Sequence, residues 1–344
     1  MTHLVDHTPS ASSGAAAEWT RSLAAYRNPI LSRSRYELAV TAIPFAALFA
    51  LAWAALSVSP WISVALSLAN AAFLVRLFMI QHDCGHGAFF GSRQWNDWVG
   101  RVIGVLTLTP YGVWRRTHAV HHATTGNLDR RGVGDIPTLT VSEYRAKSLF
   151  RRGCYRLVRH PVILFGLVPS YTFFLRNRLP VGLMRSGWRF WASALGTDAA
   201  ILAFLASLYL LGGLPVLLFV YLPTVLLAAS TGMWLFYIQH QFEETSWESD
   251  ADWSVHAAAF EGSSHYVLPP ILNWITANIG VHHVHHLASR IPFYRLSEVL
   301  RDHDVLANVP RLTLRDSLGC ASLALWDEKG RRLVSFAEAR WLAA

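Results

Sequence analysis

Charged residues are scarce in this sequence. They make up 15% of its 344 residues, against roughly 25% in an average soluble domain, and this shortage argues against an ordinary soluble enzyme. A disordered chain is also excluded, because disorder requires low hydrophobicity and 53% of the residues are apolar. Fourteen Trp, eleven Tyr and eighteen Phe suit a protein that meets two boundaries between water and lipid.

Cysteine is scarce as well. The three cysteines, Cys84, Cys154 and Cys320, are odd in number and form no CxxC motif. They therefore exclude a disulfide framework. We expect them to be reduced thiols that face the cytosol.

Long apolar runs are what the sequence has instead. Four of them come close to the ~20 residues with which a helix crosses the hydrocarbon core of a bilayer: residues 38–58, 61–80, 192–211 and 214–238. Ser59-Pro60 joins the first two and Gly212-Gly213 joins the last two. The sequence therefore predicts an all-α integral membrane protein with four transmembrane helices in two hairpins. Arg76, near the end of the second run, is expected to extend its charge to the membrane surface.

Lysine and arginine are distributed in step with these runs. Residues 1–37 hold four of the thirty basic residues, residues 82–191 hold sixteen and residues 239–344 hold nine, whereas the two short turns hold none. The positive-inside rule then places both termini and the long middle segment in the cytosol. This distribution also accounts for the net charge of +8 without a nucleic-acid partner.

Three parts therefore follow one another along the chain. We expect a polar cytosolic tail over residues 1–37, a membrane domain over residues 38–300 and a cytosolic segment over residues 301–344. The cytosolic parts of the membrane domain are expected to form a helical cap over the spans.

Several apolar features are too short or too polar to count as spans. Residues 98–114, 161–175 and 266–281 are semi-apolar runs that contain Gly or Pro, and we expect them at the membrane interface or packed on the spans. Asp198 lies inside the third span. A carboxylate there is either functional or a satisfied polar contact near a helix end.

Histidine is abundant, with sixteen residues, and it clusters in three places. These are HDCGH at 82–86, HAVHH at 118–122 and HHVHH at 282–286. Positions i, i+3 and i+4 share one face of a helix, so the spacing predicts two convergent imidazoles in the first motif and three in each of the others. His283 falls about 100° away around the helix and is expected to be a neighbour of the ligands rather than a ligand.

Eight convergent imidazoles suit two metal ions with open coordination positions, because one zinc ion takes four ligands at most. Imidazole binds iron, zinc, copper and nickel alike, so the ligand type alone does not select the metal. A ninth candidate is His240, which follows the fourth span as His82 follows the second. The alternative for His240 is an interfacial histidine that caps a helix end.

The remaining histidines are isolated, and we assign them no metal role: His3, His7, His160, His256, His265 and His303. Metal-bound imidazoles usually donate their second N–H to a carboxylate or carbonyl. The candidates for such an acceptor are Asp83, Asp129, Asp135, Glu243 and Glu244. Solvated loop charge is the equal alternative for these carboxylates.

Four segments carry a family resemblance: HDCGHG at 82–87, HAVHHATTGNLDRRGVGDIPTLTVSEY at 118–144, YIQHQFEET at 237–245 and NIGVHHVHHLASRIPFY at 278–294. Together they resemble the membrane fatty acid desaturases, specifically the bacterial acyl-lipid type. The resemblance implies a di-iron centre on the cytosolic face. Its ligands would be His82, His86, His118, His121, His122, His282, His285 and His286, with His240 matching an additional family histidine.

The same resemblance implies an O2-dependent reaction that removes hydrogens from two adjacent methylenes of a fatty acyl lipid and leaves a cis double bond. It also implies a bacterial inner membrane location with the active site in the cytosol. The sequence has no haem-binding HPGG and no GxGxxG after a strand-like run. Electrons are therefore expected from another protein, by family analogy a ferredoxin or a flavodoxin.

Alternative functions remain open at this level. A lipid hydroxylase or ketolase of the same fold would carry the same motifs. A multi-span metal transporter would be expected to place its polar ligands within the spans, whereas the clusters here lie outside them. A zinc membrane protease would require HExxH, and HDCGH lacks the catalytic glutamate.

Overall fold

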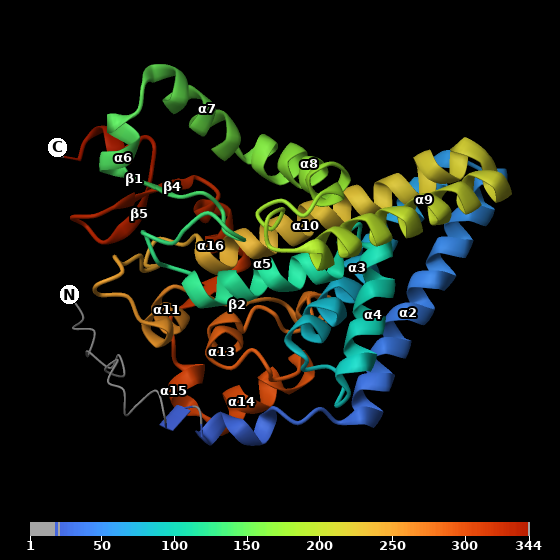
Figure 1. The fold of residues 1–344 in the computed structure, drawn as a ribbon, viewed down its shortest axis with the longest axis horizontal. Coiled ribbons are helices and arrows are strands. Elements are labelled where there is room, and N and C mark those ends of the chain that lie inside the picture. The colour runs from blue at the N-terminus through green and yellow to red at the C-terminus, as the bar shows by residue number, and fades with distance from the viewer. Residues whose placement is uncertain (1–17, 20, 343–344) are drawn as a thin grey trace.

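The computed structural model describes residues 18, 19 and 21–342, so His3 and His7 lie outside the described residues. The chain is mostly helical. Four long apolar helices extend together toward one end of the molecule, and shorter helices and strands form a broad cap at the other (Figure 1). The histidine motifs lie where the long helices enter this cap.

The first helical hairpin consists of α2 (Leu31–Ala54), a 3-10 turn (Ala55–Ser57) and α3 (Pro60–His86). Ser59 caps α3 by accepting a hydrogen bond from the Trp61 N–H, and Pro60 occupies the first helical turn, where a missing N–H costs nothing. The helix α3 continues past the expected end of the span at residue 80. Its last turn therefore carries the first histidine motif.

The second hairpin consists of α9 (Trp188–Val216), a π-helical turn (Leu217–Tyr221) and α10 (Leu222–His240). Gly213 has φ 70° and ψ −171°, a conformation that glycine adopts far more readily than other residues. The chain reverses there, and α10 returns beside α9 (Figure 1). As one straight helix, these 53 residues would be about 80 Å long, more than twice the ~30 Å thickness of a hydrocarbon core.

The turns of the two hairpins meet. A Cβ added to Gly212 would lie 2.5 Å from the Trp53 ring, near the end of α2. Both turns therefore lie at the same end of the molecule. By length and composition, three helical stretches among the described residues could cross a membrane: Leu31–Ser57, Pro60–His86 and Trp188–His240. A bent pair, Leu149–Arg159 and Ile163–Arg178, passes the same test only when its two halves are taken together, across a bend of 64°.

Between the two hairpins lies a series of shorter elements. They are α4 (Arg93–Leu106), α5 (Tyr111–Thr124), α6 (Val141–Ala146), α7 (Leu149–Arg159), a π-helical turn (Ile163–Leu167), α8 (Val168–Phe174) and the 3-10 turn η4 (Arg176–Arg178). As expected, the short apolar runs pack on the long helices. The Tyr111 hydroxyl donates to the Cys84 carbonyl at the end of α3 (2.8 Å), and the Phe165 ring packs edge-on against Tyr237 of α10.

After α10 the chain forms short helices around the site. They are α11 (Val255–Glu261), α12 (Pro270–Ile275), α13 (His282–Leu287), α14 (Leu296–Asp302), α15 (Asp304–Ala307) and α16 (Leu314–Cys320). Further 3-10 turns span Leu23–Tyr26, Phe293–Arg295 and Glu338–Arg340.

Two small sheets in the cap depart from the expectation of an all-α protein. One has the order β1-β4-β5, with β1 (Leu139–Thr140) parallel to β4 (Leu323–Asp327) and β4 antiparallel to β5 (Arg332–Ser335). The other pairs β2 (His265–Val267) with β3 (Arg311–Thr313). Strands of two to five residues are too short to show the alternation by which a strand is recognised in a sequence.

Arg76 and the start of the first helix also differ from expectation. The helix α2 begins at Leu31 instead of residue 38 and so brings Glu37 opposite α3. Arg76 is 1% exposed and pairs with Glu37 instead of reaching the membrane surface. Its guanidinium also donates to Thr41 Oγ1 (3.1 Å) and to the Trp274 carbonyl. The segment expected to be a polar tail therefore supplies the counter-charge.

Asp198 is neutralised in a similar way. Its carboxylate accepts a hydrogen bond from the Arg178 guanidinium at 2.6 Å. Arg178 also donates to the Leu108 carbonyl (2.6 Å). This arrangement favours the interpretation of Asp198 as a satisfied polar contact that joins α9 to η4.

Candidate metal centre

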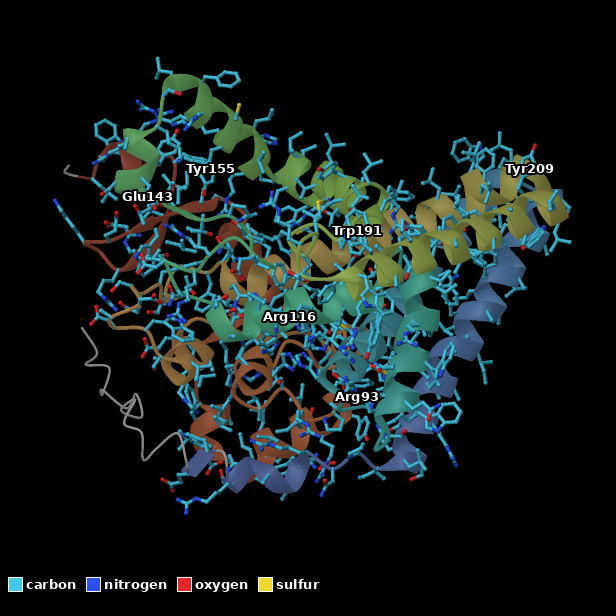
Figure 2. The ribbon with its side chains drawn as sticks, viewed as in Figure 1. Arg93, Arg116, Glu143, Tyr155, Trp191 and Tyr209 are labelled. Atoms are coloured by element: carbon cyan, nitrogen blue, oxygen red, sulfur yellow. The ribbon has the colours of Figure 1, made fainter. Side chains whose placement is uncertain are left out.

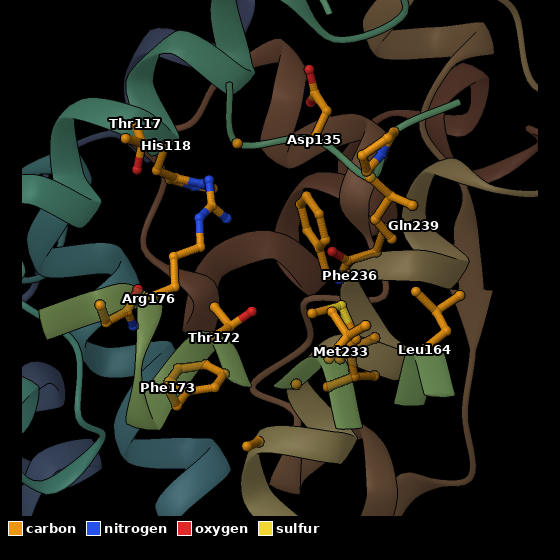
Figure 3. Close-up of a pocket in the computed structure, with 18 of the residues that line it drawn as sticks. Thr117, His118, Asp135, Leu164, Thr172, Phe173, Arg176, Met233, Phe236 and Gln239 are labelled. Carbon is orange, nitrogen blue, oxygen red and sulfur yellow. The ribbon is translucent and has the colours of Figure 1, made fainter. Parts of the chain in front are cut away.

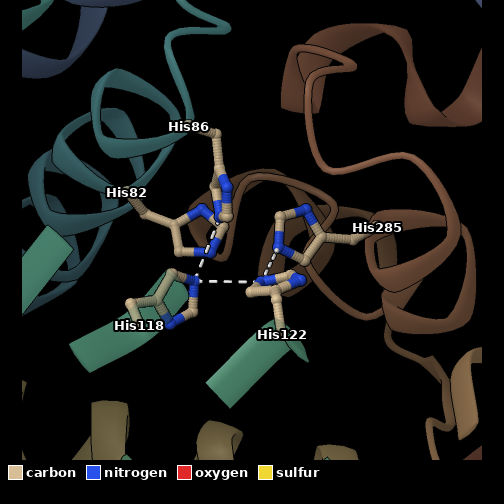
Figure 4. Close-up of side chains that lie close together, drawn as sticks. All are labelled: His82, His86, His118, His122 and His285. Atoms are coloured by element: carbon tan, nitrogen blue, oxygen red, sulfur yellow. Dashed lines mark hydrogen bonds between the residues drawn. The ribbon is translucent and has the colours of Figure 1, made fainter. Parts of the chain in front are cut away.

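Four elements bring nine histidines together in the middle of the molecule. The last turn of α3, the helix α5 and the helix α13 supply the first cluster, which consists of His82, His86, His118, His122 and His285 (Figure 4). Its Nε2 atoms form a chain of close approaches: His86 to His118 at 3.0 Å, His118 to His122 at 3.1 Å and His122 to His285 at 3.1 Å.

The second cluster consists of His121, His240, His282 and His286. His240 stands at its centre, because its Nε2 lies 3.1 Å from that of His121 and 3.0 Å from that of His282. The His286 ring centroid lies 4.6 Å from that of His282. The Nε2 atom of His286 is buried and has no hydrogen-bond partner.

The HxxHH motifs are divided between the two clusters, which corrects the expectation that their three imidazoles converge on one point. His118 and His122 belong to the first cluster, but His121 belongs to the second. In α13 the division is reversed, because His282 and His286 share the second cluster and His285 joins the first. Side chains at i+3 and i+4 diverge by about 100° around a helix, so one motif reaches two sites.

The positions of the nitrogens fit bound cations. His121 and His240 engage their Nδ1 atoms with Asp135 (2.6 Å) and the Gly262 carbonyl (2.9 Å). An imidazole whose Nδ1 carries the proton has a lone pair on Nε2 with which it can bind a metal, and the Nε2 atoms of His121 and His240 lie 3.1 Å apart. At a metal–nitrogen distance of about 2.1 Å, two ligands at a right angle would lie about 3.0 Å apart.

Burial favours the neutral form of the cluster imidazoles, which is the form that binds a metal. It lowers the pKa of five cluster histidines on α5 and α13 well below the usual range, and neighbouring imidazoles lower the pKa further: His118, His122, His282, His285 and His286. These side chains are therefore neutral at pH 7, which is the state that binds metal.

Two of the five candidate carboxylates lie beside the imidazoles. Asp135 contacts His121, and Asp83 lies 3.4 Å from His82 Nδ1 while its other oxygen accepts the Phe293 N–H (2.7 Å). The other three do not contact the clusters. Asp129 accepts the Asp250 N–H (2.8 Å), Glu243 pairs with Arg332 (2.8 Å) and Glu244 is exposed.

His283 lies outside both clusters, as its helical position predicts. It is buried, its Nε2 donates to the Leu306 carbonyl (3.0 Å), and its ring packs against that of His265 (5.3 Å between centroids). Of the other histidines that the structure describes, none belongs to either cluster.

Trp114 is a site residue that the sequence analysis missed. Its ring stacks on His118, with centroids 4.6 Å apart and planes 14° apart. A Cβ added to Gly85 would lie 2.6 Å from the same ring, so the glycine between His82 and His86 makes room for it. The signal was available, because position 114 precedes His118 by four residues and therefore lies on the same face of the helix.

A cavity of about 710 Å³ opens beside both clusters (Figure 3). His82 and His118 of the first cluster and His282 of the second line it. Its walls are mostly apolar and come from α3, the π-helical turn at Ile163–Leu167, α8 and α10, with Leu74, Phe78, Leu164, Phe173, Met233 and Phe236 among them. A volume of this size is typical of a small-molecule site, and an apolar ligand inside it would lie beside the imidazoles that line it.

The chain is similar to known proteins that are named fatty acid desaturases. The family model "Fatty acid desaturase" matches residues 59–312. A fatty acid desaturase of Bacillus subtilis (strain 168) is 44% identical over 317 residues, which cover 92% of this chain and 90% of that protein. An sn-1 acyl-lipid omega-3 desaturase (ferredoxin) of Synechocystis is 30% identical over 231 residues, or 64% of this chain and 61% of that protein. The chain therefore belongs to the fatty acid desaturase family of oxidoreductases.

Proposed function

We propose that this protein is an O2-dependent di-iron desaturase that introduces a cis double bond into the acyl chain of a membrane lipid. The observation that carries the proposal is that both histidine clusters border one apolar cavity. The five histidines of the first cluster would hold one iron and the four of the second cluster, His240 included, would hold the other. Bound iron supplies the oxidising power that an unactivated methylene demands, since its hydrogens are not acidic and acid–base residues alone cannot remove them.

The protein's own residues would orient the chain and hold the imidazoles. The apolar walls of the cavity bind methylenes and exclude water. Asp135 and the Gly262 carbonyl hold the protons of His121 and His240 on Nδ1, which leaves each Nε2 free to bind metal. Trp114 fixes the ring plane of His118 by stacking.

Expression in a bacterium with a compatible electron donor is expected to yield new unsaturated acyl chains in membrane lipid, detected by mass spectrometry of the extracted lipids. Hydroxy or keto lipids without alkenes would instead favour a hydroxylase or ketolase. Metal analysis of the purified protein provides the second measurement. Two irons per chain are expected, and a single zinc would contradict the proposal.

The membrane topology is part of the proposal. We propose four crossings, with both termini and the metal centre in the cytosol, in the inner membrane of a bacterium. Trp191 and Tyr209, near the two ends of α9 (Figure 2), are separated by about 27 Å of helix. This spacing suits aromatic residues at two membrane interfaces.

Cysteine labelling tests the topology. In a protein whose exposed Cys154 is replaced by Ser, cysteines at Val58 or Leu211, each 77% exposed beside a turn, are expected to react with impermeant reagents from outside the cell. Leu211 serves better than Gly213, whose positive φ disfavours other residues. Cysteines at Arg93 or Arg311 are expected to stay unlabelled. Labelling at Arg311 but not at Leu211 would overturn the topology.

The electron donor is proposed to be a ferredoxin or flavodoxin. A basic cytosolic face would attract an acidic donor, so turnover with the donor limiting is expected to fall as salt is raised, because exposed charges are screened over about 8 Å at physiological ionic strength. The measurement is the rate at several salt concentrations with donor below saturation. A rate that does not change with salt would remove the argument for an electrostatically guided donor.

A further inference from the structure

The helix α7 presents its apolar side to the outside. Leu149 and Phe150 are each 80% exposed, and Leu157 is 61% exposed. The arginines on the opposite side face inward. Arg156 donates to the Tyr144 hydroxyl (2.6 Å) and the buried Arg159 to the Leu323 carbonyl (3.0 Å). This is the reverse of a helix on a soluble protein, whose apolar stripe faces the core.

Basic side chains lie at the edge of the cavity, and this observation is independent of the exposure of α7. Lys147, Arg151 and Arg176 line the cavity, and the Arg176 side chain extends into it from η4 (Figure 3). Among the residues that the structure describes, none of the three forms an ion pair with an acid. Of the described residues that line the cavity, Asp135 is the only acid, and it contacts His121. Arg151 and Arg176 therefore stand at an apolar cavity without a paired acid, whereas Lys147 is close enough to Glu143 to help lower the pKa of that carboxyl group.

Two arginines near the cavity, in contrast, do form ion pairs with acids. Arg131 pairs with Glu143 (2.5 Å) and Arg178 with Asp198 (2.6 Å). The buried Arg159, which also lines the cavity, donates to the Gln241 side chain (2.8 Å) and to the Leu323 carbonyl (3.0 Å), which are neutral acceptors. Arg131 and Arg178 are thus neutralised by acids of the chain, whereas Arg151 and Arg176 at the cavity form no ion pair with an acid among the described residues.

We propose that Lys147, Arg151 and Arg176 bind the phosphate of a phospholipid whose acyl chain enters the cavity, while α7 lies in the surface layer of the bilayer. The proposal rests on the proposed function for the use made of that chain. Phosphate is the anion that suits the site, because a guanidinium binds it through paired N–H groups. The apolar face of α7 matches the way in which an interfacial helix sits among lipids, beside the place where the lipid would enter.

The test uses the full-length protein in neutral detergent micelles. Three photoactivatable probes carry the same acyl chain with a diazirine near its end: a phosphatidylglycerol, a diacylglycerol and an acyl coenzyme A. Cross-linking to the α10 peptide reports occupancy of the cavity, since Ala228, Gly232 and Phe236 of α10 line it. The variant Arg151→Gln/Arg176→Gln removes two of the cations. The control Arg185→Gln/Arg189→Gln makes the same charge change at exposed arginines outside the cavity lining.

Phosphatidylglycerol is expected to label α10 at half-maximum at about a tenfold lower mole fraction than diacylglycerol, as one charge-assisted contact would provide. The Arg151→Gln/Arg176→Gln variant is expected to lose this difference while diacylglycerol labelling is unchanged, and the control is expected to keep it. Equal labelling by both lipids in the wild type, or the same loss in the control, would overturn the proposal. Stronger labelling by acyl coenzyme A than by phosphatidylglycerol would overturn the choice of a lipid headgroup.

The cross-linking is independent of turnover and of iron. A protein that prefers phosphatidylglycerol but makes no unsaturated lipid would contradict the proposed function and leave the phosphate site standing. A protein that makes unsaturated lipid equally well from all three carriers, with no effect of the arginine variants, would support the proposed function and contradict the phosphate site.

Discussion

Replacing His240 with alanine is expected to abolish turnover and to lower the bound iron, while the protein still inserts into the membrane. The Nε2 of His240 lies between those of His121 and His282, at 3.1 and 3.0 Å, so its loss leaves the second cluster with three histidines. The Nδ1 contact with the Gly262 carbonyl would be lost as well, which leaves that carbonyl without this donor. Iron per chain, measured by mass spectrometry of the purified protein, and the yield of unsaturated lipid are the two readouts.

His283 provides the matched control for this experiment. It is a buried histidine of the same motif as His282, but its side chain bonds the Leu306 carbonyl instead of facing a cluster. His283→Ala is therefore expected to keep most of its iron, with a loss of stability of about 1–3 kcal/mol from the unsatisfied carbonyl. Loss of iron in the His283 variant together with full metal and activity in the His240 variant would show that the ninth ligand is wrongly assigned.

Eight histidines of the two clusters could be predicted because their spacing repeats the period of a helix, and His240 could be predicted because it follows the fourth apolar run as His82 follows the second. What the spacing could not provide is the division between two clusters. His121 and His122 are adjacent in sequence, yet they belong to different clusters, because which of two diverging side chains meets which partner depends on how α5 and α13 pack. The same reason separates His285 from His286.

The polar contacts inside the long helices were predicted less well. Arg76 in isolation indicates a charge that must reach water, and only the approach of Glu37 from α2 makes a buried position tolerable. The short strands of the cap carry no pattern of their own, since β1 pairs with a strand nearly two hundred positions along the chain. Local sequence patterns therefore do not predict the contacts between segments that are distant in the sequence.

The buried Arg76–Glu37 pair leads to the prediction with the largest effect on stability. Glu37→Gln is expected to destabilise the protein by about 3–5 kcal/mol, because it leaves the guanidinium in the interior without a counter-charge. Unfolding in mixed micelles of neutral detergent and sodium dodecyl sulfate, followed by Trp fluorescence, provides the measurement. The double variant Glu37→Leu/Arg76→Met is expected to be more stable than either single change, since it removes both charges together.

Arg33 supplies the control for that comparison. It pairs with the same carboxylate at 2.8 Å, but its side chain is 52% exposed, and an exposed pair contributes about 1 kcal/mol or less. Arg33→Gln is therefore expected to change stability little. Because Arg76 also holds the Trp274 carbonyl of α12, the segment before the third histidine motif, the double variant is expected to be folded but to bind less iron. Equal destabilisation by Glu37→Gln and Arg33→Gln would mean that the buried pair has no special role in holding α2, α3 and α12 together.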